Sequence, residues 1–160
     1  MFPTKNDLAE DVRTKAIELL NARLADAIDL ATQVKQAHWN VKGPNFIALH
    51  ELFDKINEDV EEYVDDIAER AVQLGGVAEG TARLAVKRST LPEYPTKTVE
   101  GADHVEALSS VLAAFGKLAR AAIDSANDWG DLDTADLFTE ISRGIDKWLW
   151  FVEAHQQTRR

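Results

Sequence analysis

Apolar residues recur every three or four positions over most of the chain, which is the spacing of an amphipathic helix. Asn6 or Asp7 is expected to cap the first helix and Asn45 the second, because short polar side chains accept hydrogen bonds from free N–H groups there. No stretch alternates as a strand does. The pattern predicts four long helices, at about residues 6–40, 45–74, 101–129 and 132–155.

Helix-breaking residues separate these segments. They are Gly43-Pro44, Gly75-Gly76 and Gly130. Residues 77–100 contain Gly80, Pro92 and Pro95, show little periodicity, and are long enough to cross a bundle and hold a short helix. Two long helices, a crossover and two more long helices predict an all-α, ferritin-like four-helix bundle with one long crossover connection. We expect one domain over 1–160, with a short tail at 1–5 and a short basic tail at 156–160.

The second predicted helix carries an unusual charge pattern. At about 100° per residue, one face spanning about 120° is almost entirely acidic, and Lys55 is the only cation near this face before Arg70. Metal ions would offset the repulsion, since hard and borderline metals prefer oxygen ligands with an imidazole nearby. The alternative is an acidic face that is neutralised by cations but has no activity. The face comprises His50, Glu51, Asp54, Glu58, Glu61, Glu62, Asp65 and Glu69.

Composition narrows the function classes. The chain has no Cys, which excludes disulfides, thiolate metal sites and Cys nucleophiles. Its net charge of −10 argues against a general nucleic-acid-binding surface and favours cationic partners. No apolar run approaches membrane length, and the N-terminus has no apolar core of a signal peptide. We therefore expect a cytoplasmic protein that does not interact with membranes.

The spacing of the acidic face predicts where a metal would bind. None of the four His residues lies three positions after a Glu, so the Glu-x-x-His pairs of sites inside a bundle are absent. His50 and Asp54 share one face, as do Asp65 and Glu69, but the two pairs lie about 16 Å apart along the helix at 1.5 Å per residue. Two antiparallel copies across a two-fold axis would join them into two identical sites.

His38, at the end of the first helix, could complete such a site, although a lone His on an apolar face is more often buried and bonded to a carbonyl. Two imidazoles and three carboxylates suit Fe(II) well and Zn(II) acceptably.

Several blocks of sequence resemble the Dps family, the DNA-binding proteins from starved cells. The resemblance extends over roughly residues 14–154 and is loosest over 77–100. Its blocks are QAHWNVKGPNF (36–46), LHELFD (49–54), AERAVQLGG (68–76), TADLFTE (134–140) and DKWLWFVE (146–153).

The resemblance implies a hollow cage of twelve subunits, built from two-fold dimers, that oxidises Fe(II) with hydrogen peroxide and stores ferric mineral. It implies a di-iron ferroxidase site made by His38, His50 and Asp54 of one subunit with Asp65 and Glu69 of its neighbour. No ligand position is substituted. Trp39 matches an aromatic residue beside that site and could trap oxidising equivalents. Packing at an interface is the other interpretation of Trp39.

Further acidic residues have two interpretations each. Glu58, Glu61 and Glu62 would nucleate mineral or form a solvated face. Asp131, Asp133 and Asp136 would line an iron-entry pore or complement the dipole of the fourth helix. DNA binding is weakly supported, because the Lys-rich tail is missing and only Arg159-Arg160 forms a basic end. The alternative functions are a nucleoid-binding protein and a non-catalytic cage that sequesters metal.

Overall fold

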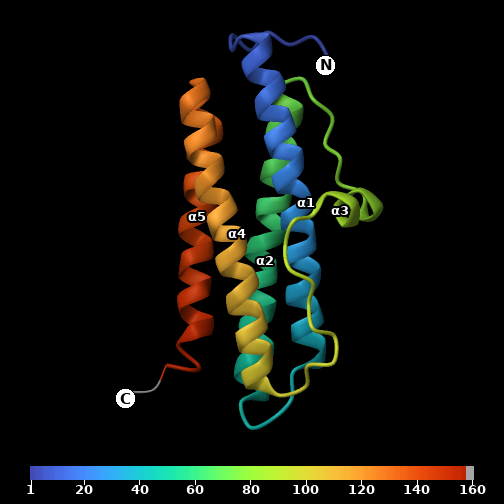
Figure 1. Ribbon diagram of the computed structural model, residues 1–160, viewed down its shortest axis with the longest axis vertical. Coiled ribbons are helices and arrows are strands. Elements are labelled where there is room, and N and C mark those ends of the chain that lie inside the picture. The colour runs from blue at the N-terminus through green and yellow to red at the C-terminus, as the bar shows by residue number, and fades with distance from the viewer. Residues whose placement is uncertain (158–160) are drawn as a thin grey trace.

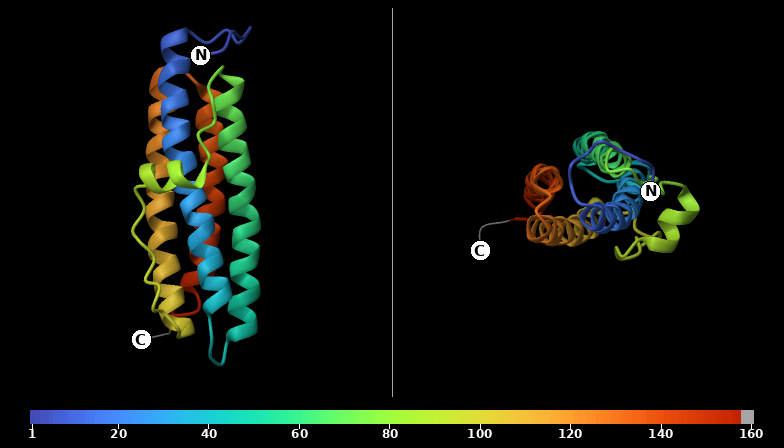
Figure 2. Two further views of the ribbon diagram at one scale, coloured as in Figure 1. Left: turned by 90° about the vertical axis from the view of Figure 1, so that its right-hand side faces the viewer. Right: turned by 90° about the horizontal axis from the view of Figure 1, so that it is seen from above.

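The fold is an elongated bundle of four long helices. A computed structural model describes residues 1–157, and the basic pair Arg159-Arg160 lies outside them. The long helices lie side by side along the long axis of the molecule, and the crossover passes along one side of the bundle (Figures 1 and 2). Its helices are α1 (Glu10–Asn40), α2 (Phe46–Gln73), the short α3 (Ala82–Arg88) in the crossover, α4 (Gly101–Trp129) and α5 (Leu132–Glu153).

Helix pairing follows the order along the chain. α1 packs mainly on α2 and α4 mainly on α5, while α1 also contacts α4 and α3. Within residues 1–157 no strand forms, and one isolated bridge joins Lys42 to Glu100. The prediction of an all-α four-helix bundle with one long crossover is confirmed.

The ends of two helices differ from the prediction. α1 begins at Glu10, later than predicted. The side-chain oxygen of Asn6 accepts a hydrogen bond from the N–H of Leu8 (3.0 Å), so Asn6 forms a local turn instead of capping the helix. The segment before this turn is also held elsewhere, since the N–H of Phe2 donates to the carbonyl of Gly75 (2.7 Å).

At the other end of the chain, α5 stops at Glu153 instead of His155. Asn45 precedes α2 as predicted, but its side chain makes no capping hydrogen bond.

The core explains why these helices form where the periodicity places them. Its largest fully buried side chains come from all four long helices and include Leu24, Phe53, Phe115 and Phe138. Gly130, with φ of 80°, provides the left-handed residue that lets the chain reverse between α4 and α5. Among residues 1–157, no helix combines the length and apolar character needed to cross a bilayer.

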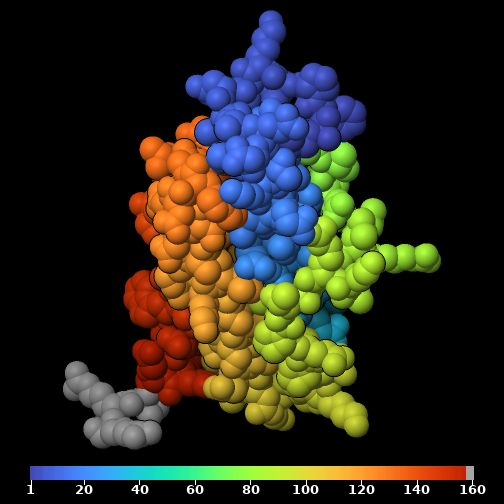
Figure 3. All heavy atoms as spheres, turned by 45° about the horizontal axis from the view of Figure 1, so that its top comes forward, coloured from blue at the N-terminus to red at the C-terminus, as the bar shows by residue number. Residues whose placement is uncertain are grey.

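The crossover is fixed to the surface of α1. Asp26 accepts hydrogen bonds from the N–H (2.7 Å) and hydroxyl (3.1 Å) of Thr90, and Asp29 accepts one from the hydroxyl of Ser89 (2.5 Å). Figure 3 shows the crossover exposed beside α1. These bonds set the position of the chain that leads into α4.

Candidate metal centre

Two histidines meet where α1 ends and α2 begins. His38 lies in the last turn of α1 and His50 near the start of α2, and their rings stack with centroids 3.7 Å apart and planes 21° apart. The short turn after Asn40 folds α2 back along α1, which brings the two rings together. The sequence placed each His near this turn but did not show that they touch.

Each imidazole bonds the backbone of the other residue. Nδ1 of His38 lies 2.8 Å from the backbone carbonyl oxygen of His50. Nδ1 of His50 lies 2.9 Å from the backbone carbonyl oxygen of His38. The last bond of the α1 ladder joins the N–H of Val41 to the carbonyl of Ala37, so the carbonyl of His38 is free to accept from His50. A carbonyl only accepts, so both Nδ1 atoms carry hydrogen and both Nε2 atoms keep their lone pairs. This is the tautomer that binds metal through Nε2.

Asp54 adds an ionised carboxylate beside this pair. Its Oδ1 lies 3.9 Å from Nε2 of His38 and forms an ion pair with the ammonium of Lys35. The hydrogen bond from Lys35 lowers the pKa of Asp54, and the positive charge of Lys35 acts in the same direction, against the effect of desolvation. The structure thus brings three of the five predicted ligands together at one end of the protomer.

Lys35 was not predicted to take part. It lies three residues before His38, at the position that holds Glu in a Glu-x-x-His pair. That i,i+3 spacing is the sequence signal that could have found it, since it puts Lys35 on the same side of α1 as His38.

The other two predicted ligands lie farther along α2 and are exposed. α2 is one continuous helix, so the estimate of about 16 Å between Asp54 and Asp65 stands. Glu69 lies one turn beyond Asp65. Within residues 1–157, no three His, Cys, Asp or Glu side chains are grouped closely enough to hold a metal ion. One protomer therefore presents two separate parts of the predicted site.

Large apolar side chains are exposed around both parts. Trp39, Phe46 and Ile47 are 68%, 40% and 59% exposed near the two histidines, and Phe46 lies 5.1 Å from the ring of His50. Val72, 55% exposed, follows Glu69 on the same helix. Apolar surface of this kind often marks a contact with another chain.

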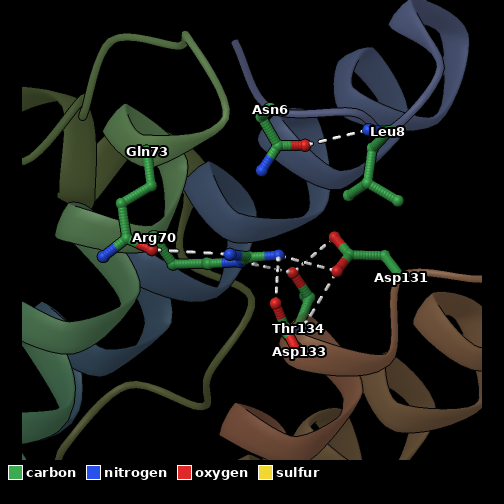
Figure 4. A network of polar contacts seen from close by, with 7 residues as sticks. All are labelled: Asn6, Leu8, Arg70, Gln73, Asp131, Asp133 and Thr134. Carbon is green, nitrogen blue, oxygen red and sulfur yellow. Dashed lines mark hydrogen bonds and ion pairs between the residues drawn. The ribbon is translucent and has the colours of Figure 1, made fainter. Parts of the chain in front are cut away.

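Asp131 has a structural role that the sequence left open. Its carboxylate is buried, caps α5 through the N–H (3.1 Å) and hydroxyl (2.6 Å) of Thr134, and accepts from Arg70 of α2 at 2.8 Å (Figure 4). Arg70 also approaches Asp133, at 3.8 Å. Asp133 and Asp136 are exposed, so these two remain free to face a pore.

The three candidate nucleation residues, Glu58, Glu61 and Glu62, are exposed on α2. One oxygen of Glu61 accepts from the side-chain amide of Asn57 at 2.7 Å.

Comparison with known proteins agrees with this architecture. A family model described as a ferritin-like domain matches residues 17–160, which gives the class of protein. A protein of Agrobacterium fabrum named DNA protection during starvation protein is 46% identical over 156 residues, covering 98% of this chain and 96% of the relative. The chain belongs to the Dps branch of the ferritin-like proteins.

Solved structures support the same assignment. The tetragonal form of Mycobacterium smegmatis Dps is 33% identical and superposes with a TM-score of 0.93, covering 98% of this chain and 95% of that one. DpsA14 from Streptomyces coelicolor is 34% identical with a TM-score of 0.92, covering 97% and 92%.

Proposed function

We propose that this protein is a ferroxidase that takes up Fe(II) as its substrate, oxidises it with hydrogen peroxide and stores ferric mineral in a cytoplasmic cage. The observation that carries the proposal is the reciprocally bonded pair of His38 and His50. Its two Nε2 atoms keep their lone pairs beside the ionised carboxylate of Asp54. Membership of the family supports iron chemistry in general.

The site is completed across a two-fold axis. In an antiparallel pair of α2 helices, Asp65 and Glu69 of one copy face the imidazoles of the other, which yields two identical sites per dimer. The exposed apolar residues near the two ends of α2 are the surfaces that this contact would cover. Six such dimers would form a dodecamer. Zn(II) would bind the same ligands without redox chemistry.

The reaction follows from the ligand set. Two Fe(II) ions each give one electron to a single peroxide, which takes up two protons and leaves as two waters. The carboxylates favour this direction because hard oxygen ligands stabilise Fe(III) more than Fe(II). Two-electron reduction releases no hydroxyl radical. In this scheme Trp39 is the oxidisable neighbour of the site.

Other carboxylates would guide iron before and after its oxidation. Asp133 and Asp136 would draw Fe(II) to a pore at the start of α5, with Asp131 fixing the local backbone. The exposed carboxylates of Glu58, Glu61 and Glu62 would collect the ferric product.

A mixed-subunit experiment tests the shared site. His50→Ala and Asp65→Ala chains, carrying different tags, are co-expressed and purified through both tags. Each variant alone should lose rapid Fe(II) oxidation in stopped-flow absorbance. A dimer that combines them keeps one site intact, so random pairing restores about one quarter of the sites.

The control is Asp66→Ala. It removes the exposed carboxylate of the residue after Asp65, and this carboxylate acts on Tyr63. It should leave the rate unchanged. If hybrids of His50→Ala and Asp65→Ala regain no activity while both variants assemble normally, the shared site is wrong. If the wild-type cage binds iron without accelerating its oxidation, the protein only sequesters metal.

DNA binding is the second candidate, because curated relatives carry the name DNA protection during starvation protein. The net charge of −10 acts against it. Gel shifts at low and physiological salt, with and without residues 158–160, test it. A shift of the DNA band that persists at physiological salt and requires residues 158–160 would support DNA binding.

A further inference from the structure

A buried tyrosine–histidine pair lies outside the proposed iron site. Tyr94 of the crossover is 8% exposed, and His104 near the start of α4 is fully buried. The hydroxyl of Tyr94 is hydrogen-bonded to Nδ1 of His104, and the two rings lie 6.1 Å apart at 24°. The bridge between Lys42 and Glu100 ties the start of α4 to the turn between α1 and α2, at the same end as the metal centre (Figure 1).

The direction of this hydrogen bond can be inferred. Burial lowers the pKa of His104 and keeps the ring neutral, while the backbone of Asn40 acts in the opposite direction, as a carbonyl does when it faces an imidazole N–H. Nδ1 is already occupied by the hydroxyl of Tyr94, so we assign the hydrogen to Nε2, which makes no hydrogen bond within residues 1–157. Nδ1 then accepts from the phenol of Tyr94.

This arrangement favours loss of an electron from Tyr94. Burial raises the pKa of the hydroxyl, so the phenol stays protonated at neutral pH. An oxidised phenol is a strong acid, and a neutral base already hydrogen-bonded to it can take the proton without any movement of the chain.

The pair is also connected to the predicted site by position. Tyr94 and Trp39 line the same groove beside α1 and α3. Trp39 directly follows His38 in the sequence. The shared groove therefore relates Tyr94 to the aromatic residue that adjoins the predicted ligand His38.

We propose that Tyr94 supplies one electron when peroxide meets a site that holds a single Fe(II), with His104 accepting the phenolic proton. The proposal rests on the ferroxidase function above. Peroxide takes two electrons, one from Fe(II) and one from Tyr94 through Trp39, and two protons from solvent, and gives two waters. The O–H bond of Tyr94 breaks, leaving a phenoxyl radical and an imidazolium on His104. A later Fe(II) reduces the radical, and His104 returns the proton.

The chain contains a matched control. Its other tyrosine, Tyr63, is half-buried on α2. Burial first, and then the nearby carboxylates of Asp59 and Glu140, raise its pKa to about 12. Within residues 1–157 no histidine is hydrogen-bonded to its hydroxyl, in contrast to Tyr94.

The test is freeze-quench electron paramagnetic resonance of the assembled protein, loaded with one Fe(II) per predicted site and mixed with peroxide. We expect a tyrosyl signal in the wild type and in Tyr63→Phe, and its loss in Tyr94→Phe. His104→Phe should also lose it, because the proton then has no acceptor. Spin trapping should detect more hydroxyl radical from Tyr94→Phe than from Tyr63→Phe. An unchanged tyrosyl signal in Tyr94→Phe overturns the proposal.

A second oxidant separates this proposal from the ferroxidase function. A photoexcited ruthenium polypyridyl complex with a sacrificial quencher can oxidise the iron-free cage by one electron. A tyrosyl signal that depends on Tyr94 but not on Tyr63 supports the oxidisable pair even if peroxide oxidation of Fe(II) proves slow. If Fe(II) oxidation is fast while neither oxidant produces a radical on Tyr94, the pair is structural only.

Discussion

The buried ion pair between Arg70 and Asp131 should carry a large part of the local stability where α2 meets α5. The Asp131→Ala change removes two interactions. It deletes the cap of α5, worth about 1 kcal/mol, and it leaves the guanidinium of Arg70, whose side chain is only 11% exposed, without its carboxylate. Breaking a buried pair from one side typically costs about 3 kcal/mol or more.

We therefore expect Asp131→Ala to lower the local free energy of opening by about 4 kcal/mol, roughly a thousandfold in the opening equilibrium. Asp131→Asn keeps an acceptor at the cap and should cost less. Asp133→Asn is the matched control. The Asp133 side chain is 86% exposed and lies 3.8 Å from Arg70, so the change should cost no more than about 0.5 kcal/mol.

Hydrogen exchange measured by mass spectrometry suits an assembled protein, because it reports local opening without a two-state melt. Peptides covering the first turns of α5 and the last turn of α2 are compared at a fixed state of assembly. The double variant Arg70→Met/Asp131→Ser removes both charges and restores a cap, so it should recover most of the protection. The reasoning fails if Asp133→Asn matches the effect of Asp131→Ala, or if the double variant is no better than Asp131→Ala alone.

Two further predictions concern the ends of the bundle. Burial lowers the pKa of His104, so below about pH 6.5 the unfolded chain binds a proton that the folded chain does not, and stability should fall on acidification by up to about 1.4 kcal/mol per pH unit. Urea unfolding at several pH values should show a shallower dependence for His104→Gln, and an equal dependence would contradict the assignment. Gly75→Ala should release the N-terminal segment, because its φ of 91° is unfavourable for Ala and the new Cβ would lie 2.6 Å from the carbonyl oxygen of Phe2. Faster hydrogen exchange over the first residues measures this release, and unchanged exchange argues against it.

The sequence predicted the helices well because their apolar spacing and their breakers agree. α4 begins at Gly101 and ends at Trp129, as the pattern indicated, since Gly130 adopts the left-handed conformation that stops it. The start of α1 was predicted too early, because the side chain of Asn6 accepts from the N–H of Leu8 in a local turn instead of capping the helix. The segment before this turn is held by a hydrogen bond from Phe2 to Gly75, which the sequence pattern does not show because the two residues are distant in the chain.

The candidate site was predictable only in part. Helical spacing identified which carboxylates share a face, but the mutual bonds of His38 and His50 depend on how tightly the turn brings α1 against α2. Tyr94 showed no helical pattern, because its position comes from the crossover rather than from any periodicity. Asp131 had two interpretations, and only the tertiary approach of Arg70 shows that its carboxylate acts as a cap inside the protomer.

Lys35 links the missing Glu-x-x-His pair to the proposed site between subunits. An ammonium in place of the Glu of a Glu-x-x-His pair neutralises Asp54 within one protomer, so the two imidazoles and one carboxylate are a weak site for a divalent cation on their own. Asp65 and Glu69 of a second copy would add two negative charges, enough for Fe(II) to compete with the ammonium for Asp54. On the proposed function, strong iron binding therefore depends on assembly, because the carboxylates that outweigh Lys35 come from another chain.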